Sequence, residues 1–241
     1  MTNGIESYYN IIRMPWGRMS YDLIFNQLNI DDKSNLHVLD FGSGFGILAN
    51  HYAQKHTVTA IEPNEEMRAL RFSENNYTQI AGGFDALNEI DDKFDLVACH
   101  NVLEYTENPD EIFAALANTL KIGGRLSIVK HNCLGRAMAA AVFEENPQKA
   151  LDLIIENKDV EHFFGMRKLY TNECAEKLGK SNGLSLTQIY GIRTFFALTQ
   201  NNDIKFTDEW YDKMLELEIV ASCMDEYIKV AFLNHLIFEK K

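Results

Sequence analysis

Residues 38–46 read VLDFGSGFG, and this stretch decides the fold. An apolar run leads into three glycines at alternate positions, which is typical of a buried strand that turns sharply into a helix. Such a turn lets backbone N–H groups approach a ligand that side chains would exclude. Glu62 ends a second apolar run, where its carboxylate can accept both hydroxyls of a ribose. The sequence therefore predicts a cofactor that contains a nucleoside.

The charge beside the glycines narrows the cofactor further. Asp40 lies two residues before Gly42. A carboxylate there repels the pyrophosphate of a nicotinamide or flavin dinucleotide, whereas it attracts a ligand with a sulfonium and an ammonium group. This charge pattern favours S-adenosylmethionine. The alternative is a glycine turn that only packs a strand against a helix.

Composition describes one ordinary globular protein. The chain has 241 residues, of which 46% are hydrophobic, and this length suits one large α/β domain with insertions. The formal net charge of −12 opposes non-specific binding of nucleic acid, although it leaves room for a local basic patch.

Targeting and metal signals are weak. Polar and charged residues interrupt the first thirty positions, so we expect neither a signal segment nor a membrane span, and we expect a cytoplasmic enzyme. The four cysteines form no C-x-x-C pair, so we expect free thiols and no metal site.

Strands and helices alternate through the first half, which indicates parallel crossovers. We expect a helix over Arg18 to Asn29, another over Asn64 to Phe72, and a last strand over Glu226 to Phe238. The expected organisation is a single domain over 1–241 with its core at about 18–132 and 171–241. A helical cap insertion is expected at about 133–170 and a further helical insertion at about 199–224.

The glycine motif, Glu62, and the run Phe94 to Tyr105 (FDLVACHNVLEY) resemble class I S-adenosylmethionine-dependent methyltransferases. The resemblance implies a Rossmann-like α/β fold with a seven-stranded, mostly parallel sheet in the order 3-2-1-4-5-7-6 and an antiparallel last strand. It also implies that Gly42 and Gly44 approach the cofactor, that Asp40 lies near its amino-acid part, and that Glu62 holds the ribose.

Within that class, three segments resemble the bacterial enzymes that esterify 5-carboxymethoxyuridine in tRNA. They are residues 100–109 (HNVLEYTENP), residues 191–196 (GIRTFF), and residues 215–218 (LELE) leading to Tyr227 and Ile228. An arginine of those enzymes that touches the cofactor aligns with Ser20 here, which leaves Arg18 as the displaced candidate. The resemblance implies a modified wobble uridine of tRNA as substrate and tRNA as partner.

These observations give three sets of expected site residues. The catalytic candidates are His100, at the end of the fourth strand, and Arg193, as anchor for a carboxylate acceptor. The expected cofactor-binding residues are Arg18, Asp40, Gly42, Ser43, Gly44, Gly46, Glu62, Pro63, Phe84, Asp85 and His100. The expected substrate-binding residues are Lys130, His131, Arg136, Arg167, Tyr170 and Arg193.

Two other functions stay open. The acidic net charge favours a small-molecule O- or N-methyltransferase over an RNA-modifying enzyme. A non-catalytic module that uses the fold to bind the cofactor is the third hypothesis, and the intact glycines and carboxylates weigh against it. Tyr8, Tyr9 and Trp16 are expected either to cover the cofactor or to fasten the first helix to the sheet. The sequence leaves the oligomeric state open.

Overall fold

A computed structural model of the chain describes residues 3–33, 35–155 and 171–241. Its centre is a sheet in the order β3-β2-β1-β4-β5-β7-β6. The strands are β1 (His37–Phe41), β2 (Thr57–Glu62), β3 (Thr78–Ala81), β4 (Phe94–His100), β5 (Leu120–His131), β6 (Leu184–Ile192) and β7 (Leu233–Lys240). Among the strands that the structure describes, β7 alone runs against its neighbours, β5 and β6. This topology confirms the predicted fold class.

The central strands are mainly apolar because both faces of the sheet are covered. In β4, Val97 and Cys99 point into one core, and Leu96 and Ala98 into the other. The core containing Val97 is closed by α5 (Phe84–Asn88), α6 (Pro109–Thr119) and α9 (Asn172–Ser181). The core containing Leu96 is closed by α2 (Pro15–Leu28), α3 (Ile47–Tyr52) and α10 (Asp208–Ala221).

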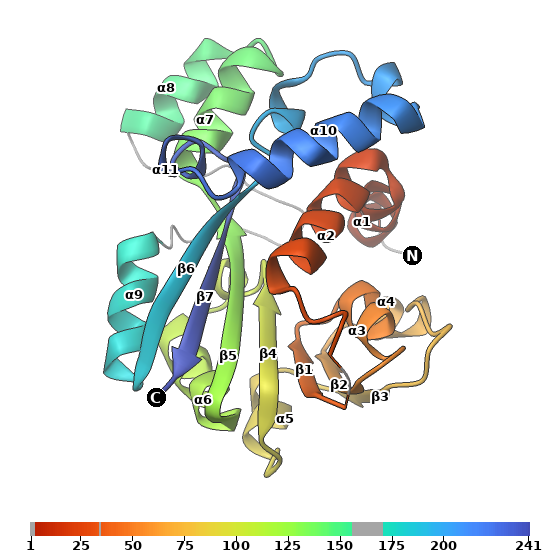
Figure 1. Cartoon of the computed structure of the whole chain (residues 1–241), viewed down its shortest axis with the longest axis vertical. Helices are drawn as coiled ribbons and strands as arrows, with labels where there is room; N and C mark the ends of the chain where they lie inside the picture. The colour runs from red at the N-terminus through yellow and green to blue at the C-terminus, as the bar shows by residue number, and fades with distance from the viewer. Residues whose placement is uncertain (1–2, 34, 156–170) are drawn as a thin grey trace.

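Further helices gather beyond the carboxyl ends of β4 and β5, at the top of Figure 1. They are α7 (Cys133–Val142), α8 (Pro147–Ile155) and α11 (Asp225–Ile228), and α10 lies beside them. Short helical turns η1 (Leu103–Tyr105), η2 (Phe196–Leu198) and η3 (Asp203–Phe206) complete the connections. Because ligands of open α/β sheets bind at the carboxyl ends of the strands, these elements surround the expected site.

Three expected elements differ from the structure. The helix expected over Asn64 to Phe72 is only α4 (Glu65–Ala69), which begins where the Asn64 side chain accepts the N–H of Met67. The strand expected from Glu226 begins at Leu233, because residues 225–228 form α11. A helix that the pattern did not indicate, α1 (Asn3–Arg13), precedes α2, which starts at Pro15 rather than Arg18.

Among the residues that the structure describes, no helix combines the length and the apolar character that crossing a membrane requires.

Candidate functional site

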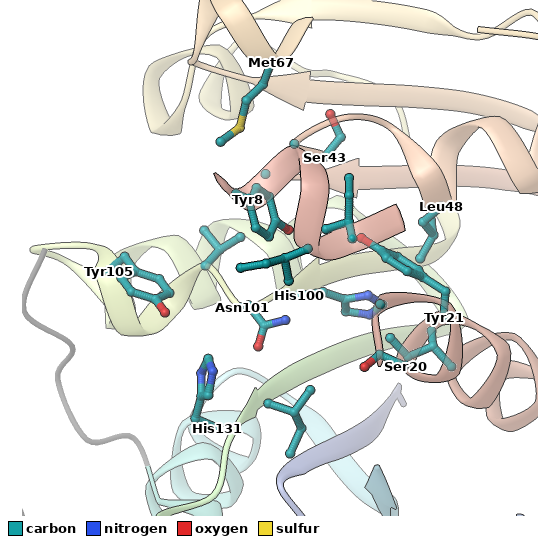
Figure 2. Close-up of a pocket in the computed structure, with 18 of the residues that line it drawn as sticks. Tyr8, Ser20, Tyr21, Ser43, Leu48, Met67, His100, Asn101, Tyr105 and His131 are labelled. Carbon is teal, nitrogen blue, oxygen red and sulfur yellow. The ribbon is translucent and has the colours of Figure 1, made fainter. Parts of the chain in front are cut away.

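A cavity of about 630 Å³ opens at the carboxyl end of the sheet. Figure 2 shows side chains from α1, α2, the glycine turn and the ends of β4 and β5 converging on it. Segments that are far apart in the sequence therefore form one site, and the following residues define its chemistry.

The glycine turn forms one wall. Gly42, Gly44 and Gly46 have φ values of 71°, 55° and 71°, a region that L side chains avoid. A Cβ on Gly42 would meet Val102 at 2.3 Å, whereas the nearest atom to one on Gly44 is in Tyr8, at 4.0 Å. Gly44 thus keeps the backbone open toward the cavity. Gly46 does not line the cavity, because it is the N-cap of α3 and faces the hydroxyl of Tyr77.

Glu62 is the acidic residue best placed to hold a ribose. Its side chain is buried and lines the cavity. One carboxylate oxygen accepts the N–H of Gly44 at 2.8 Å, and the other accepts the N–H of Asn64 at 2.8 Å. Each oxygen keeps a further lone pair for a ligand hydroxyl. Burial raises the pKa of Glu62, and the two N–H donors oppose that rise.

Asp40 and Ser43 carry buried polar atoms that a ligand could satisfy. Oδ2 of Asp40 and Oγ of Ser43 are buried, have no hydrogen-bond partner among the described residues, and belong to residues that line the cavity. Burial and the charge of Glu62 raise the pKa of Asp40 to about 7. A buried carboxylate of this kind needs a cationic partner, and the ammonium group of S-adenosylmethionine supplies one. The residues present therefore fit this cofactor.

Tyrosines from the two N-terminal helices cover the opposite side. The Tyr8 and Tyr21 side chains hydrogen-bond to each other, and both line the cavity (Figure 2). Tyr9 instead packs edge-on against Phe45, with the ring centroids 4.9 Å apart. The N-terminal segment therefore both covers the cavity and fastens α1 to the glycine turn.

His131 and Glu104 form a pair at the end of β5. Glu104 accepts the backbone N–H of His131 at 3.0 Å, and its second oxygen lies 3.0 Å from the ring nitrogen Nδ1. The hydrogen bonds and charge of His131 hold the pKa of Glu104 below its ordinary value although burial opposes this. Because Glu104 accepts the proton on Nδ1, the neutral form of the His131 ring has its lone pair on Nε2. Figure 2 shows the imidazole pointing from β5 toward Asn101 in the cavity.

His100 lies deeper in the same cavity, at the end of β4. Its Nε2 is 2.7 Å from the hydroxyl of Ser127, which is in turn 2.7 Å from Nε2 of His235. Burial lowers the pKa of His100 to about 3, so the ring is neutral. Ser127 and His235 carried no signal in the sequence, because the register of three strands brings them together.

Arg193 lines the cavity in a strained turn after β6, with φ at 61°. Its guanidinium lies 4.9 Å from the centre of the Phe232 ring, and its Nε is buried without a hydrogen-bond partner among the described residues. Buried Glu218 holds this turn by accepting the N–H groups of Thr194, Phe195 and Phe196. Burial lowers the pKa of Arg193 to about 10, which leaves it cationic at neutral pH.

The structure does not bring every expected residue to the cavity. Arg18 lies over the Tyr211 ring at 4.1 Å and pairs with Asp22. Lys130 is buried outside the cavity lining, and Asp85 is exposed in the first turn of α5. Phe84 lines an adjoining cavity of about 290 Å³, which shares Gly42, Pro63, Val102 and Thr106 with the larger one. Arg167 and Tyr170 lie outside the described residues.

The cavity lining otherwise contains these members of the expected sets: Asp40, Gly42, Ser43, Gly44, Glu62, Pro63, His100, His131, Arg136 and Arg193. Sequence reasoning missed Tyr21 and Phe232, and it gave no role to Glu104 although it quoted the motif that contains it. The only signal for Glu104 was an acidic residue in an otherwise apolar run after β4.

Comparison with known proteins agrees with this geometry. Residues 39–128 match the family model described as a methyltransferase domain. A ubiquinone biosynthesis O-methyltransferase of Pseudomonas fluorescens (strain Pf0-1) is 35% identical over 109 residues, which are 40% of this chain and 46% of that protein. A protein of the same name from Aeromonas salmonicida (strain A449) is 26% identical over 206 residues, 75% of this chain and 80% of that protein. The match thus spans less than half the length of the Pseudomonas relative.

Solved structures share the fold. The magnesium protoporphyrin IX methyltransferase of Synechocystis PCC 6803 with bound SAH covers 91% of this chain and 81% of its own, with a TM-score of 0.58 and 16% identity. A plantazolicin methyltransferase in complex with SAH covers 98% of this chain and 89% of its own, with a TM-score of 0.60 and 16% identity. Residues 39–128 therefore match a methyltransferase domain in sequence, and the described residues share the fold of methyltransferases solved with SAH.

Proposed function

We propose that this protein transfers the methyl group of S-adenosylmethionine to a hydroxyl oxygen of a small molecule. The observation that carries the proposal is the His131–Glu104 pair, which meets the same cavity as the glycine turn, Asp40 and Glu62. A hydroxyl acceptor carries a proton that a base must remove, whereas a carboxylate acceptor needs no base. The names of the two relatives, both O-methyltransferases of ubiquinone biosynthesis, support oxygen as the target.

The roles of the residues follow from their places. The carboxylate of Glu62 receives the ribose hydroxyls, and Asp40 receives the ammonium group. When bound, the cofactor supplies a methyl group on a positively charged sulfur. His131 takes the hydroxyl proton at Nε2, and Glu104 stabilises the imidazolium that forms. The aromatic residues over the cavity exclude water, which strengthens each of these interactions.

Arg193 and Arg136 give the cavity a cationic side. Both guanidinium groups lie over the Phe232 ring, at 4.9 and 5.8 Å from its centre. We infer that the small-molecule acceptor carries an anionic group, which these residues orient while the hydroxyl meets His131.

The tRNA substrate that the sequence resemblance implied stays a prediction. Its support is the cationic pair Arg136 and Arg193, which suits a uridine carboxylate as well as an anionic metabolite. Against it stands the net charge of −12, because RNA affinity depends on neutralising phosphates. Of the other basic residues in the expected cap insertion, Lys149 pairs with Glu144, and Arg167 and Lys168 lie outside the described residues.

One labelling experiment separates the two substrates. The protein is incubated with methyl-labelled S-adenosylmethionine and either bulk tRNA or a low-molecular-weight metabolite extract, and the products are treated with mild alkali. We expect label in the small-molecule fraction that resists alkali, because an aryl or alkyl methyl ether is stable. Label in RNA that alkali releases as methanol marks a methyl ester, and that outcome replaces the small-molecule proposal with the tRNA reading.

The His131 role has its own test. His131→Asn and Glu104→Gln should lower kcat for the labelled small-molecule product by about 100-fold or more, which is the usual contribution of a general base. Binding of S-adenosylhomocysteine should stay unchanged. If both variants keep the wild-type kcat, the transfer needs no base from this pair and the acceptor atom is not a protonated hydroxyl.

A further inference from the structure

A buried chain of hydrogen bonds connects the cavity to α2 and to the end of β6. It runs from Nε2 of His100 to Ser127 (2.7 Å), from Ser127 to Nε2 of His235 (2.7 Å), and from Nδ1 of His235 to Oε1 of Gln27 (2.7 Å). Nε2 of Gln27 then donates to the carbonyl oxygen of Gly191 at 3.0 Å. Ser127, His235 and Gln27 are all buried, and only His100 lines the cavity.

The hydrogen bond between Gln27 and Gly191 fixes which atom is the donor in every other hydrogen bond of this series. The carbonyl of Gly191 can only accept, so the amide of Gln27 must turn its NH₂ group toward it. This places the Gln27 oxygen against Nδ1 of His235, and Nδ1 must carry a proton to donate to it. The reversed amide would set two acceptor oxygens against each other.

The tautomer of His235 in turn decides which hydrogen bond Ser127 donates and which it accepts. Burial, His100 and Arg125 lower the pKa of His235 well below its ordinary value, so the ring is neutral. With its proton on Nδ1, neutral His235 accepts at Nε2 the hydroxyl proton of Ser127. The serine oxygen is left to accept from Nε2 of His100, which therefore carries the proton of that ring.

We propose that Ser127, His235 and Gln27 are positioning residues that hold His100 as the Nε2-protonated tautomer and so present the lone pair of Nδ1 to the cavity. The structure records no hydrogen bond from a described residue to this Nδ1, and its burial keeps the ring uncharged. The ligand group beside His100 must then be a hydrogen-bond donor, an ammonium or a hydroxyl. The identity of that donor rests on the proposed function, whereas the tautomer does not.

A fixed acceptor at this position has a specific consequence. His100 and Asp40 point to the same face of the sheet from neighbouring strands, since Asp40 pairs with Ala98 two residues before His100. A proton on Nδ1 would set a donor against the cationic end of the cofactor, whereas the lone pair attracts it. The hydrogen bonds from Gln27 to His100 therefore keep the cavity favourable to a positively charged methyl donor.

Nitrogen NMR of the unliganded protein tests the tautomer directly. The chain has seven histidines, so selective ¹⁵N labelling of histidine gives few signals, and His100→Asn assigns those of His100. At pH 7 we expect a protonated Nε2 and an unprotonated Nδ1 for this ring. A protonated Nδ1, or an imidazolium, overturns the proposal.

Substitution at Gln27 is the sharpest variant. Gln27→Glu keeps the shape, but its carboxyl group would face the carbonyl of Gly191, so we expect it to be protonated, to donate to Gly191 and still to accept from Nδ1 of His235. Gln27→Glu should therefore keep the His100 tautomer. Gln27→Leu removes the acceptor that fixes His235, so we expect a mixture of His100 tautomers and an affinity for S-adenosylhomocysteine about tenfold lower. A single, unchanged His100 tautomer in a folded Gln27→Leu protein contradicts the directional chain.

Ser127→Ala interrupts the chain and should leave His100 in a mixture of tautomers. Ser222→Ala is the matched control, because its hydroxyl is also buried and hydrogen-bonded, to the carbonyl of Ile219, but lies outside the chain. Ser222→Ala should keep the single tautomer. If Ser127→Ala also keeps it, Ser127 has no positioning role.

Titration with S-adenosylhomocysteine identifies the donor. A change in the Nδ1 signal on binding marks a cofactor group as the donor. If the nucleoside binds without moving that signal, the donor belongs to the methyl acceptor. The NMR spectra and the titration with S-adenosylhomocysteine need no turnover. They therefore determine the His100 tautomer even if the protein methylates none of the acceptors tested.

Discussion

The carboxylate of Glu62 and the backbone N–H of Gly44 are joined by a hydrogen bond of 2.8 Å, although 18 residues separate them in the chain. The Glu62 carboxylate therefore has two roles. It ties the glycine turn to the end of β2, and it faces the cavity where a ribose would bind. Cofactor affinity and local order of the turn should consequently respond together to changes at Glu62.

Glu62→Ala should weaken binding of S-adenosylhomocysteine by about 2 to 4 kcal/mol, since it removes a charged acceptor from two ligand hydroxyls and releases the N–H of Gly44. Glu62→Gln should cost about half as much, because one acceptor oxygen remains. Calorimetry measures both. Glu65→Gln is the control, because Glu65 is exposed in the first turn of α4. Equal affinities in all four proteins would mean that another group holds the ribose.

Binding of the cofactor product should depend on pH through Asp40, whose pKa in the unliganded protein is raised to about 7. Below that pH the side chain is neutral and cannot pair with an ammonium group, so the dissociation constant should rise about tenfold from pH 8 to pH 6. Asp40→Asn should bind more weakly and lose most of this dependence. Any pH dependence of the dissociation constant that remains in Asp40→Asn is assigned to Glu62, because burial also raises the pKa of Glu62. A full slope in the variant would remove Asp40 from the site.

The parts that the sequence predicted are those with a local signal. The glycine turn, the acidic end of β2 and the apolar strands depend on residue types and short spacings, and these positions appear in the structure as expected. Elements beyond the sheet depend on tertiary contacts. Residues 225–228 are rich enough in β-branched and aromatic neighbours to suggest a strand, yet the backbone N–H groups of Tyr227 and Ile228 bond to the carbonyl of Met224 and form a helical turn.

The hydrogen-bond chain behind His100 could not be predicted for a similar reason. Ser127 and His235 are 108 residues apart. They meet because β5 and β7 pair in one particular antiparallel register, in which Val129 lies opposite His235. A buried serine and a buried histidine in two apolar strands carry no sign of each other until that register is known.

Gly46 should matter for stability rather than for contact with the ligand. A Cβ there would lie 2.2 Å from the hydroxyl oxygen of Tyr77, and φ is 71°. Gly46→Ala should therefore cost more than the strain of about 1 to 2 kcal/mol that a left-handed conformation imposes on alanine. Gly183→Ala is the matched control, since φ is also 71° but no atom lies within 4 Å of the added carbon.

Urea unfolding compares the two glycine variants. Adding Tyr77→Phe to Gly46→Ala should recover part of the loss, because the substitution removes the clashing hydroxyl, although it also removes its hydrogen bond to the carbonyl of Phe72. If Gly46→Ala costs no more than Gly183→Ala, the clash with Tyr77 is relieved by movement of the ring and the packing argument is wrong.

Arg193 should act on the acceptor through the turn that Glu218 holds. Arg193→Lys keeps the charge but loses the planar fork, and Arg193→Ala loses both, so transfer of label to the small-molecule fraction should fall in the order wild type, lysine, alanine. Affinity for S-adenosylhomocysteine should stay within about threefold, which is under ~1 kcal/mol. Arg71→Ala, an exposed arginine, serves as control.

Glu218→Gln should reproduce part of the Arg193 defect without touching the guanidinium. One of its oxygens becomes an NH₂ group that cannot accept from the N–H groups of residues 194–196, so we expect a loss of about 2 to 4 kcal/mol in the free energy of unfolding. Glu216→Gln, on the exposed side of α10, should change stability by less than about 0.5 kcal/mol. If folded Glu218→Gln transfers label as fast as the wild type, Glu218 stabilises the chain without fixing Arg193. If the alanine variant at 193 loses cofactor affinity in parallel with turnover, Arg193 binds the carboxylate of the cofactor instead of the acceptor.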